Sequence, residues 1–117
     1  MDKTGVNIYV LRLGEQDVFY VGATVRKWED RMMEMLIYDN NVPEFVKRIN
    51  KKVSVEETIL GVTPLEEMTT TLRYMRAYGV DNVRGGCFSN IILTQKQLDM
   101  IAHFMAMLFY CEEFLIV

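Results

Sequence analysis

Two short runs rich in β-branched and aromatic residues, joined by a glycine-containing polar link, constrain this chain more than any other feature. The first run is Ile8–Leu13, the second is Val18–Val21, and Gly14 opens the link between them. This pattern predicts a β-hairpin. Tyr9 and Tyr20 lie about equally far from the turn, so pairing would bring them to one face of the hairpin. On spacing alone, two tyrosines placed in this way are more often an ordinary cross-strand pair than part of a site.

Apolar residues at helical spacing predict a helix after the hairpin, over Lys27–Tyr38, with Arg31 at the edge of its apolar stripe. Further along, the chain predicts a short helix opening at Pro43, a strand at Val53–Leu60, a helix at Leu65–Tyr78 that Gly79 stops, an extended segment at Phe88–Leu93, and a helix at Gln95–Phe114. We therefore expect an α/β fold, a small central antiparallel sheet of about three strands flanked by helices. Residues 1–93 are expected to form this domain, and residues 94–117 an extra C-terminal helix packed on it or on a partner.

The composition bounds the class of protein. Half of the 117 residues are hydrophobic, which is enough for a core, and the formal net charge is −3. An acidic chain is poorly suited to grip nucleic acid by charge alone, because phosphate contacts supply most of that affinity. Two cysteines and a single histidine do not form a four-ligand zinc site. The longest apolar run, Phe104–Cys111, is too short to span a bilayer, so we expect a soluble intracellular protein without membrane contact.

One dense basic cluster stands out in the chain. Lys47, Arg48, Lys51 and Lys52 are four cations within six residues. Most charge runs are solvated faces, but this cluster is equally typical of a contact with the phosphate backbone of DNA.

The predicted last helix is apolar on nearly all sides. A helix of this kind is normally covered all round. In a domain this small, we expect one face of residues 95–116 to meet another protein or a second copy of the chain, giving a homo-oligomer.

Three motifs in order along the chain resemble the GIY-YIG nuclease superfamily, in the form found in large DNA viruses and some eukaryotes. The first is Asn7-Ile8-Tyr9, with Asn7 where the family usually has glycine, and the second is Tyr20-Val21-Gly22. The third and most specific is the Asn-Val-Arg-Gly-Gly run at Asn82–Gly86. The resemblance covers Asn7 to about Leu98, most of the chain.

This resemblance implies a metal-dependent endonuclease that hydrolyses DNA phosphodiesters. Tyr9 would help to deprotonate or orient the attacking water, and Tyr20 would line the same site. Arg31 would stabilise charge on the phosphoryl group. Glu67 would bind a single Mg²⁺ or Mn²⁺, and Asn82 would support the site. A viral type of chain would act in the cytoplasm or nucleus of a host cell, or in a virion.

Several departures from the family pattern keep a second hypothesis open. Arg31 lies one residue later after the glycine than expected, and Met35 stands where the family often has histidine. The single histidine, His103, falls in the last helix, and Glu66 competes with Glu67 as the metal ligand. The alternative is a catalytically inactive GIY-YIG-like domain that serves as a structural or assembly component.

Overall fold

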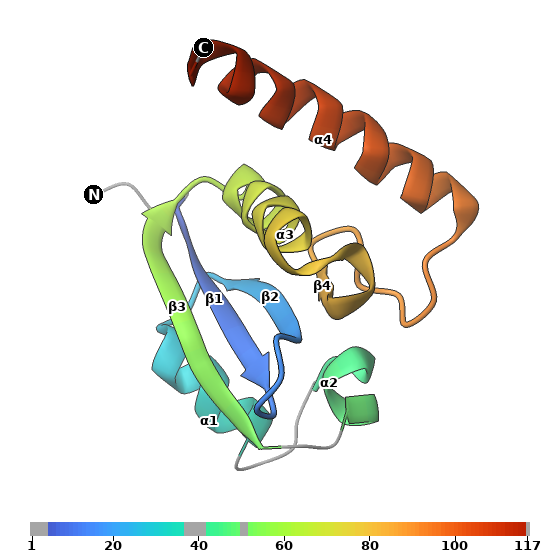
Figure 1. The fold of residues 1–117 in the computed structure, drawn as a ribbon. Helices are drawn as coiled ribbons and strands as arrows, with labels where there is room; N and C mark the ends of the chain where they lie inside the picture. The colour runs from blue at the N-terminus through green and yellow to red at the C-terminus, as the bar shows by residue number, and fades with distance from the viewer. Residues whose placement is uncertain (1–4, 37–41, 50–51, 117) are drawn as a thin grey trace.

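A four-stranded sheet forms the centre of the computed structural model, which describes residues 5–36, 42–49 and 52–116 (Figure 1). The strand order is β3-β1-β2-β4. Their bounds are β1 (Val6–Leu13), β2 (Phe19–Thr24), β3 (Val53–Val62) and β4 (Val83–Gly85). The α/β class is confirmed. The three expected antiparallel strands are present as β3, β1 and β2, but the expectation of a purely antiparallel sheet is wrong, because β4 pairs with β2 in parallel and makes the sheet mixed.

The predicted hairpin is confirmed, and so is the shared face of its two tyrosines. Tyr9 lies opposite Gly22 in the antiparallel β1–β2 ladder, and Leu11 lies opposite Tyr20. Tyr9 and Leu11 point to the same side because they are two residues apart on one strand. Tyr9 and Tyr20 are therefore diagonal neighbours on one face of the sheet.

The fourth strand was not predicted. Its three residues lie between the predicted helix at Leu65–Tyr78 and the predicted extended segment at Phe88–Leu93, and they pair with Phe19–Val21 of β2. The expected extended segment at Phe88–Leu93 contributes only an isolated bridge between Phe88 and Gly85. A strand of three residues is too short to show periodicity, so its pairing depends on the position of β2.

Helices cover both faces of the sheet (Figure 1). On one face lie α1 (Trp28–Leu36) and α2 (Glu44–Ile49), and on the other lie α3 (Leu65–Tyr78) and α4 (Gln95–Ile116), with α4 outside α3. Each face has its own core. The first cluster includes Ile8, Val10, Phe19, Val21, Leu72, Met75, Val83 and Phe88, and the second includes Tyr9, Leu11, Leu13, Met32, Met35, Phe45 and Val46. The predicted end of the first helix, at residues 37–38, lies outside the described residues.

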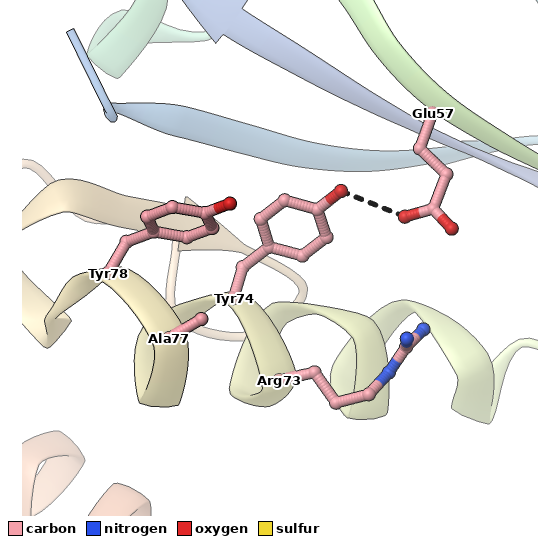
Figure 2. Close-up of a pocket in the computed structure, with 5 residues that line it drawn as sticks. All are labelled: Glu57, Arg73, Tyr74, Ala77 and Tyr78. Carbon is pink, nitrogen blue, oxygen red and sulfur yellow. Dashed lines mark hydrogen bonds between the residues drawn. The ribbon is translucent and has the colours of Figure 1, made fainter.

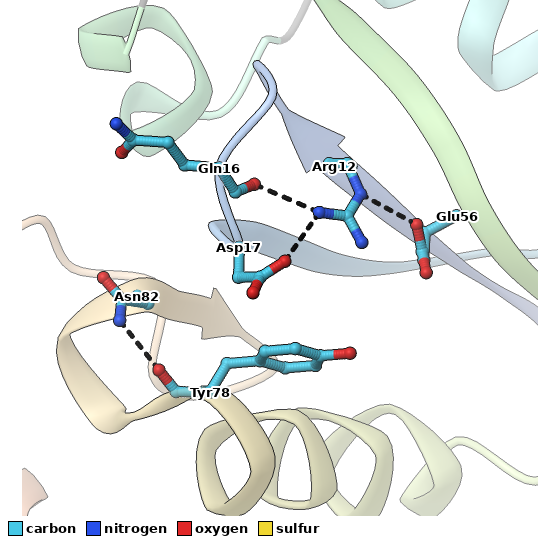
Figure 3. Close-up of polar contacts among 6 residues, drawn as sticks. All are labelled: Arg12, Gln16, Asp17, Glu56, Tyr78 and Asn82. Carbon is cyan, nitrogen blue, oxygen red and sulfur yellow. Dashed lines mark hydrogen bonds and ion pairs between the residues drawn. The ribbon is translucent and has the colours of Figure 1, made fainter.

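Polar contacts attach α3 and the hairpin turn to β3. The Tyr74 hydroxyl donates a hydrogen bond of 2.8 Å to Glu57 of β3, beside a hollow of about 240 Å³ on the face of α3 (Figure 2). Arg12 of β1 pairs with Asp17 in the turn at 2.8 Å and with Glu56 of β3 at 3.0 Å (Figure 3). These bonds tie the edge strand β3 to α3 and, through Arg12 of β1, to the hairpin turn.

The last helix is covered on one side only. Ile101 is buried in the first cluster, and Phe104, Met105 and Phe109 pack against that cluster. Met107 and Leu108 remain exposed, at 56% and 42% of their surface. Within the described chain no element covers Met107 and Leu108, and the expected partner for one face of residues 95–116 stays a prediction. Among the helices described, none is long and apolar enough to cross a bilayer.

Candidate active site

Tyr9 is fixed by the glycine opposite it. Its side chain is only 2% exposed, and a Cβ added to Gly22 would lie 2.2 Å from the ring. Such a distance is far below van der Waals contact, so the tyrosine ring occupies the space that a larger residue at position 22 would need. The Tyr-Val-Gly motif of β2 thus provides the hydroxyl of Tyr20 and, at Gly22, the space that the Tyr9 ring occupies.

Arg31 points toward the tyrosines despite its shifted position in the sequence. Its guanidinium hydrogen-bonds to the Tyr9 hydroxyl, which opposes the effect of burial on the pKa of that tyrosine. Arg31 also pairs with Glu34 at 2.9 Å, one turn along α1. Glu34 in turn accepts a hydrogen bond from Arg26. Tyr9 of β1 and Glu34 of α1 thus orient the guanidinium of Arg31.

Glu67 lies in the first turn of α3 and belongs to the same cluster. Its charge raises the pKa of both Tyr9 and Tyr20, so the carboxylate acts electrostatically on the two hydroxyls. Burial raises the pKa of Glu67 itself. Its neighbour Glu66 instead accepts a hydrogen bond of 3.4 Å from Thr69. The charge effect on the tyrosines and the hydrogen bond of Glu66 to Thr69 therefore favour Glu67 over Glu66 as the carboxylate of this site.

Burial is also the main reason why the pKa of each tyrosine is raised above its usual value. Both hydroxyls are therefore neutral at pH 7. A neutral phenol can donate and accept hydrogen bonds, so Tyr9 and Tyr20 are suited to orient a water molecule rather than to act as free phenolate bases.

The residues present fit a hard divalent cation. Within the described residues, no hydrogen bond or ion pair is made by the Glu67 carboxylate, and no group of three or more metal-ligating side chains occurs. Mg²⁺ commonly uses one or two carboxylates, keeps several waters and completes its shell with substrate phosphate. A single partly buried carboxylate is consistent with that mode of binding, because a cation would offset its desolvation.

Asn82 is not part of this cluster. Its side-chain amide donates a hydrogen bond of 2.7 Å to the Tyr78 carbonyl at the end of α3 (Figure 3). Gly79 has a positive φ of 99° there and ends the helix, as predicted. Glu67 lies at the other end of the same helix, which at 1.5 Å per residue is about 15 Å away. Asn82 thus shapes the turn that leads into β4.

The basic cluster lies beside the site on the outside of α2. Lys47 and Arg48 are exposed, Lys52 is exposed at the start of β3, and Lys51 lies outside the described residues. The inner side of α2 carries Phe45, which packs in the same cluster as Tyr9. The cations are therefore displayed on the side of the molecule that holds the tyrosines.

An open groove adjoins Tyr20 and Arg31. Its volume is about 620 Å³, and it is lined by Tyr20, Arg31, Pro43, Glu44, Ser89, Asn90 and Ile91. Sequence reasoning missed this groove and also missed Glu34. The spacing of three residues between Arg31 and Glu34 was a usable signal, since such pairs meet on a helix. No comparable signal marks Ser89 or Asn90.

Neither Met35 nor His103 supplies a histidine to the site. Met35 is 2% exposed and packs in the second cluster, where a methionine fills the core. His103 lies on the exposed side of α4, with its ring 6.1 Å from that of Phe104. The site therefore contains no histidine.

Comparison with protein-family models, with curated protein sequences and with solved structures finds no significant match to this chain. Function must therefore be inferred from the motifs and from the geometry of these side chains.

Proposed function

We propose that this chain is a metal-dependent endonuclease of the GIY-YIG type that hydrolyses phosphodiesters in DNA. One observation carries the proposal. Tyr9, Tyr20, Arg31 and Glu67 come from four different elements, and the charges of Arg31 and Glu67 both act on the pKa of Tyr9 and of Tyr20, which supports a shared site. Two hydroxyls, a guanidinium and a carboxylate at one place are the groups that phosphodiester hydrolysis requires.

Each side chain has a role that follows from its surroundings. Glu67 would hold Mg²⁺ or Mn²⁺, and the bound ion would supply Lewis acidity at a phosphoryl oxygen. Tyr9, held by Arg31, would orient the attacking water. The water oxygen forms a bond to phosphorus while the bond to the leaving sugar oxygen breaks, and Arg31 offsets the charge that develops on the phosphoryl group. Lys47 and Arg48 would contact neighbouring phosphates.

Cleavage of plasmid DNA with Mg²⁺ or Mn²⁺ tests the proposal. Arg31→Ala and Glu67→Gln should each lower the cleavage rate by about 10²–10³, as for the loss of one electrostatic stabiliser. Arg73→Ala and Glu66→Gln are matched controls on α3, and both should cleave like the wild type. No cleavage by the wild type with either ion, or full activity in both site variants, would refute the assignment.

A second candidate function is a structural role in assembly without catalysis. It is favoured by the exposed apolar side chains Met107 and Leu108 of α4, which a second copy of the chain would cover. Sedimentation should then show an oligomer that Met107→Glu dissociates. Met33→Glu is the control, because Met33 is 48% exposed on α1, which covers the opposite face of the sheet. A wild-type monomer at all accessible concentrations would exclude this self-association.

A further inference from the structure

We propose that the groove beside Tyr20 binds one unpaired nucleobase that carries an exocyclic amino group, next to the phosphodiester at the Tyr9–Glu67 cluster. This inference rests on the proposed function, because it assigns the part of a DNA substrate that adjoins the cleaved bond. Cytosine, adenine and guanine have such an amino group, whereas thymine does not.

The groove is continuous with the catalytic cluster. Tyr20 and Arg31 line the groove and also belong to the cluster. A phosphate at Arg31 would therefore place the adjoining nucleoside at the groove. Its volume of about 620 Å³ lies within the range of about 300–1,000 Å³ that is typical of sites for small ligands.

A single buried arginine holds the two walls of the groove in place. Arg84 is 5% exposed and donates hydrogen bonds to the carbonyls of Asn90 at 2.7 Å and Ile91 at 3.1 Å. Its guanidinium also lies 5.4 Å from the ring centroid of Phe45 in α2. Ser89–Ile91 form one wall and the start of α2 forms the other, so Arg84 connects both. A wall that is fixed before binding costs less entropy when a ligand arrives.

The chemistry of the lining selects a base over a phosphate. Glu44 lines the groove, with a carboxylate oxygen 4.0 Å from Nε of Arg48, and like charges repel, so a phosphate is disfavoured next to Glu44 and favoured at Arg31. A carboxylate accepts hydrogen bonds from an exocyclic amine, and the amide of Asn90 can both donate and accept. Tyr20 adds an aromatic ring against which a base can stack. A thymine would instead turn a carbonyl oxygen toward Glu44.

The base must be unpaired to reach these groups. In a duplex, the edge that Glu44 and Asn90 would read is engaged in base pairing and the base is stacked. Lys47 and Arg48 follow Glu44 within one turn of α2, where they would contact the phosphates on either side of such a nucleotide. We therefore assign the groove to a nucleotide in single-stranded DNA or to one displaced from a duplex.

Binding in the absence of metal tests this inference apart from cleavage. Fluorescence anisotropy with the full chain in EDTA would compare labelled oligodeoxycytidine, oligodeoxyadenosine and oligodeoxythymidine. We expect the cytidine and adenosine strands to bind at least about fivefold more tightly than the thymidine strand. Asn90→Ala should reduce this ratio. Glu44→Gln should tighten binding to all strands, because a repelling charge is lost, and should also reduce the ratio. Asp99→Asn on α4 is the charge-matched control.

The outcomes separate the two proposals. Equal binding of the three strands by the wild type, no binding of single strands, or a ratio that both groove variants leave unchanged would overturn the inference. If the wild type cleaves plasmid but shows no base preference, the nuclease proposal stands and the groove assignment fails. If base preference depends on Glu44 and Asn90 but no metal supports cleavage, the groove assignment stands and the nuclease proposal fails.

Discussion

Gly22 leaves the space that the Tyr9 ring fills, and substitution by alanine tests this packing directly. The added Cβ would lie 2.2 Å from one ring carbon and 2.3 Å from the hydroxyl oxygen. Ordinary contact begins at 3.4 Å, so the ring would have to move by about 1.2 Å. Tyr9 is 2% exposed, and neighbouring core side chains oppose that movement. Overpacking of this kind costs about 1–3 kcal/mol in the free energy of unfolding.

Urea denaturation of Gly22→Ala beside the wild type measures this cost. Gly5→Ala is the control, because its added Cβ would meet the nearest atom at an ordinary 3.4 Å. Tyr9→Leu provides the second arm, since a leucine side chain is too short to place atoms where the ring carbon and hydroxyl lie. In that background, Gly22→Ala should cost little, with a coupling of about 1–2 kcal/mol between the two positions. Equal costs in both backgrounds would refute the packing argument.

Three further predictions follow from buried polar groups. Glu67→Gln should raise the free energy of unfolding at neutral pH, because burial raises the pKa of Glu67 and its ionised form destabilises the fold. This gain should shrink as the pH falls into the usual titration range of glutamate, where the native carboxyl is already protonated. Urea denaturation of both proteins at neutral pH and at that lower pH measures the change. A gain that is the same at both pH values would contradict this reasoning. Arg84→Met should lower the free energy of unfolding by about 2–4 kcal/mol, since four backbone carbonyls would lose their donor, those of Asn90, Ile91, Val80 and Val83. Arg84→Lys should recover only part of this stability, and full recovery would show that a positive charge alone is sufficient. Tyr74→Phe should cost about 1 kcal/mol through loss of the bond to Glu57, and a neutral result would indicate that water replaces it.

The hairpin and its tyrosines could be predicted because all the information is local. A turn between two alternating runs sets the register, and the register sets the shared face of Tyr9 and Tyr20. The helix that carries Arg31 was predicted for the same reason. Its place at the edge of the apolar stripe also allowed Arg31 to point toward the hairpin, but its interaction with Tyr9 itself depends on how α1 lies across the sheet.

The rest of the site depends on long-range packing. Glu66 and Glu67 share the first turn of α3, and only the rotation of that helix decides which carboxylate lies near the tyrosines. Arg84 was recognised within a motif, but its partners are backbone carbonyls, which a sequence does not distinguish from any others. The groove has walls from α2 and from Ser89–Ile91, which are far apart in the chain.

The parallel pairing of β2 with β4 sets an order in time for the assembly of this protein. Phe19 pairs with Val83, so more than sixty residues must be synthesised before β2 gains its second neighbour. Closing so long a loop is slow, and until then β2 presents an open edge that can pair with other chains. Arg84, which holds the groove walls, and Asn90, which lines the groove, follow Val83 in the sequence and are therefore synthesised later still. A chain that stops before Val83 should therefore aggregate during synthesis, and the groove can form only once the sheet is complete.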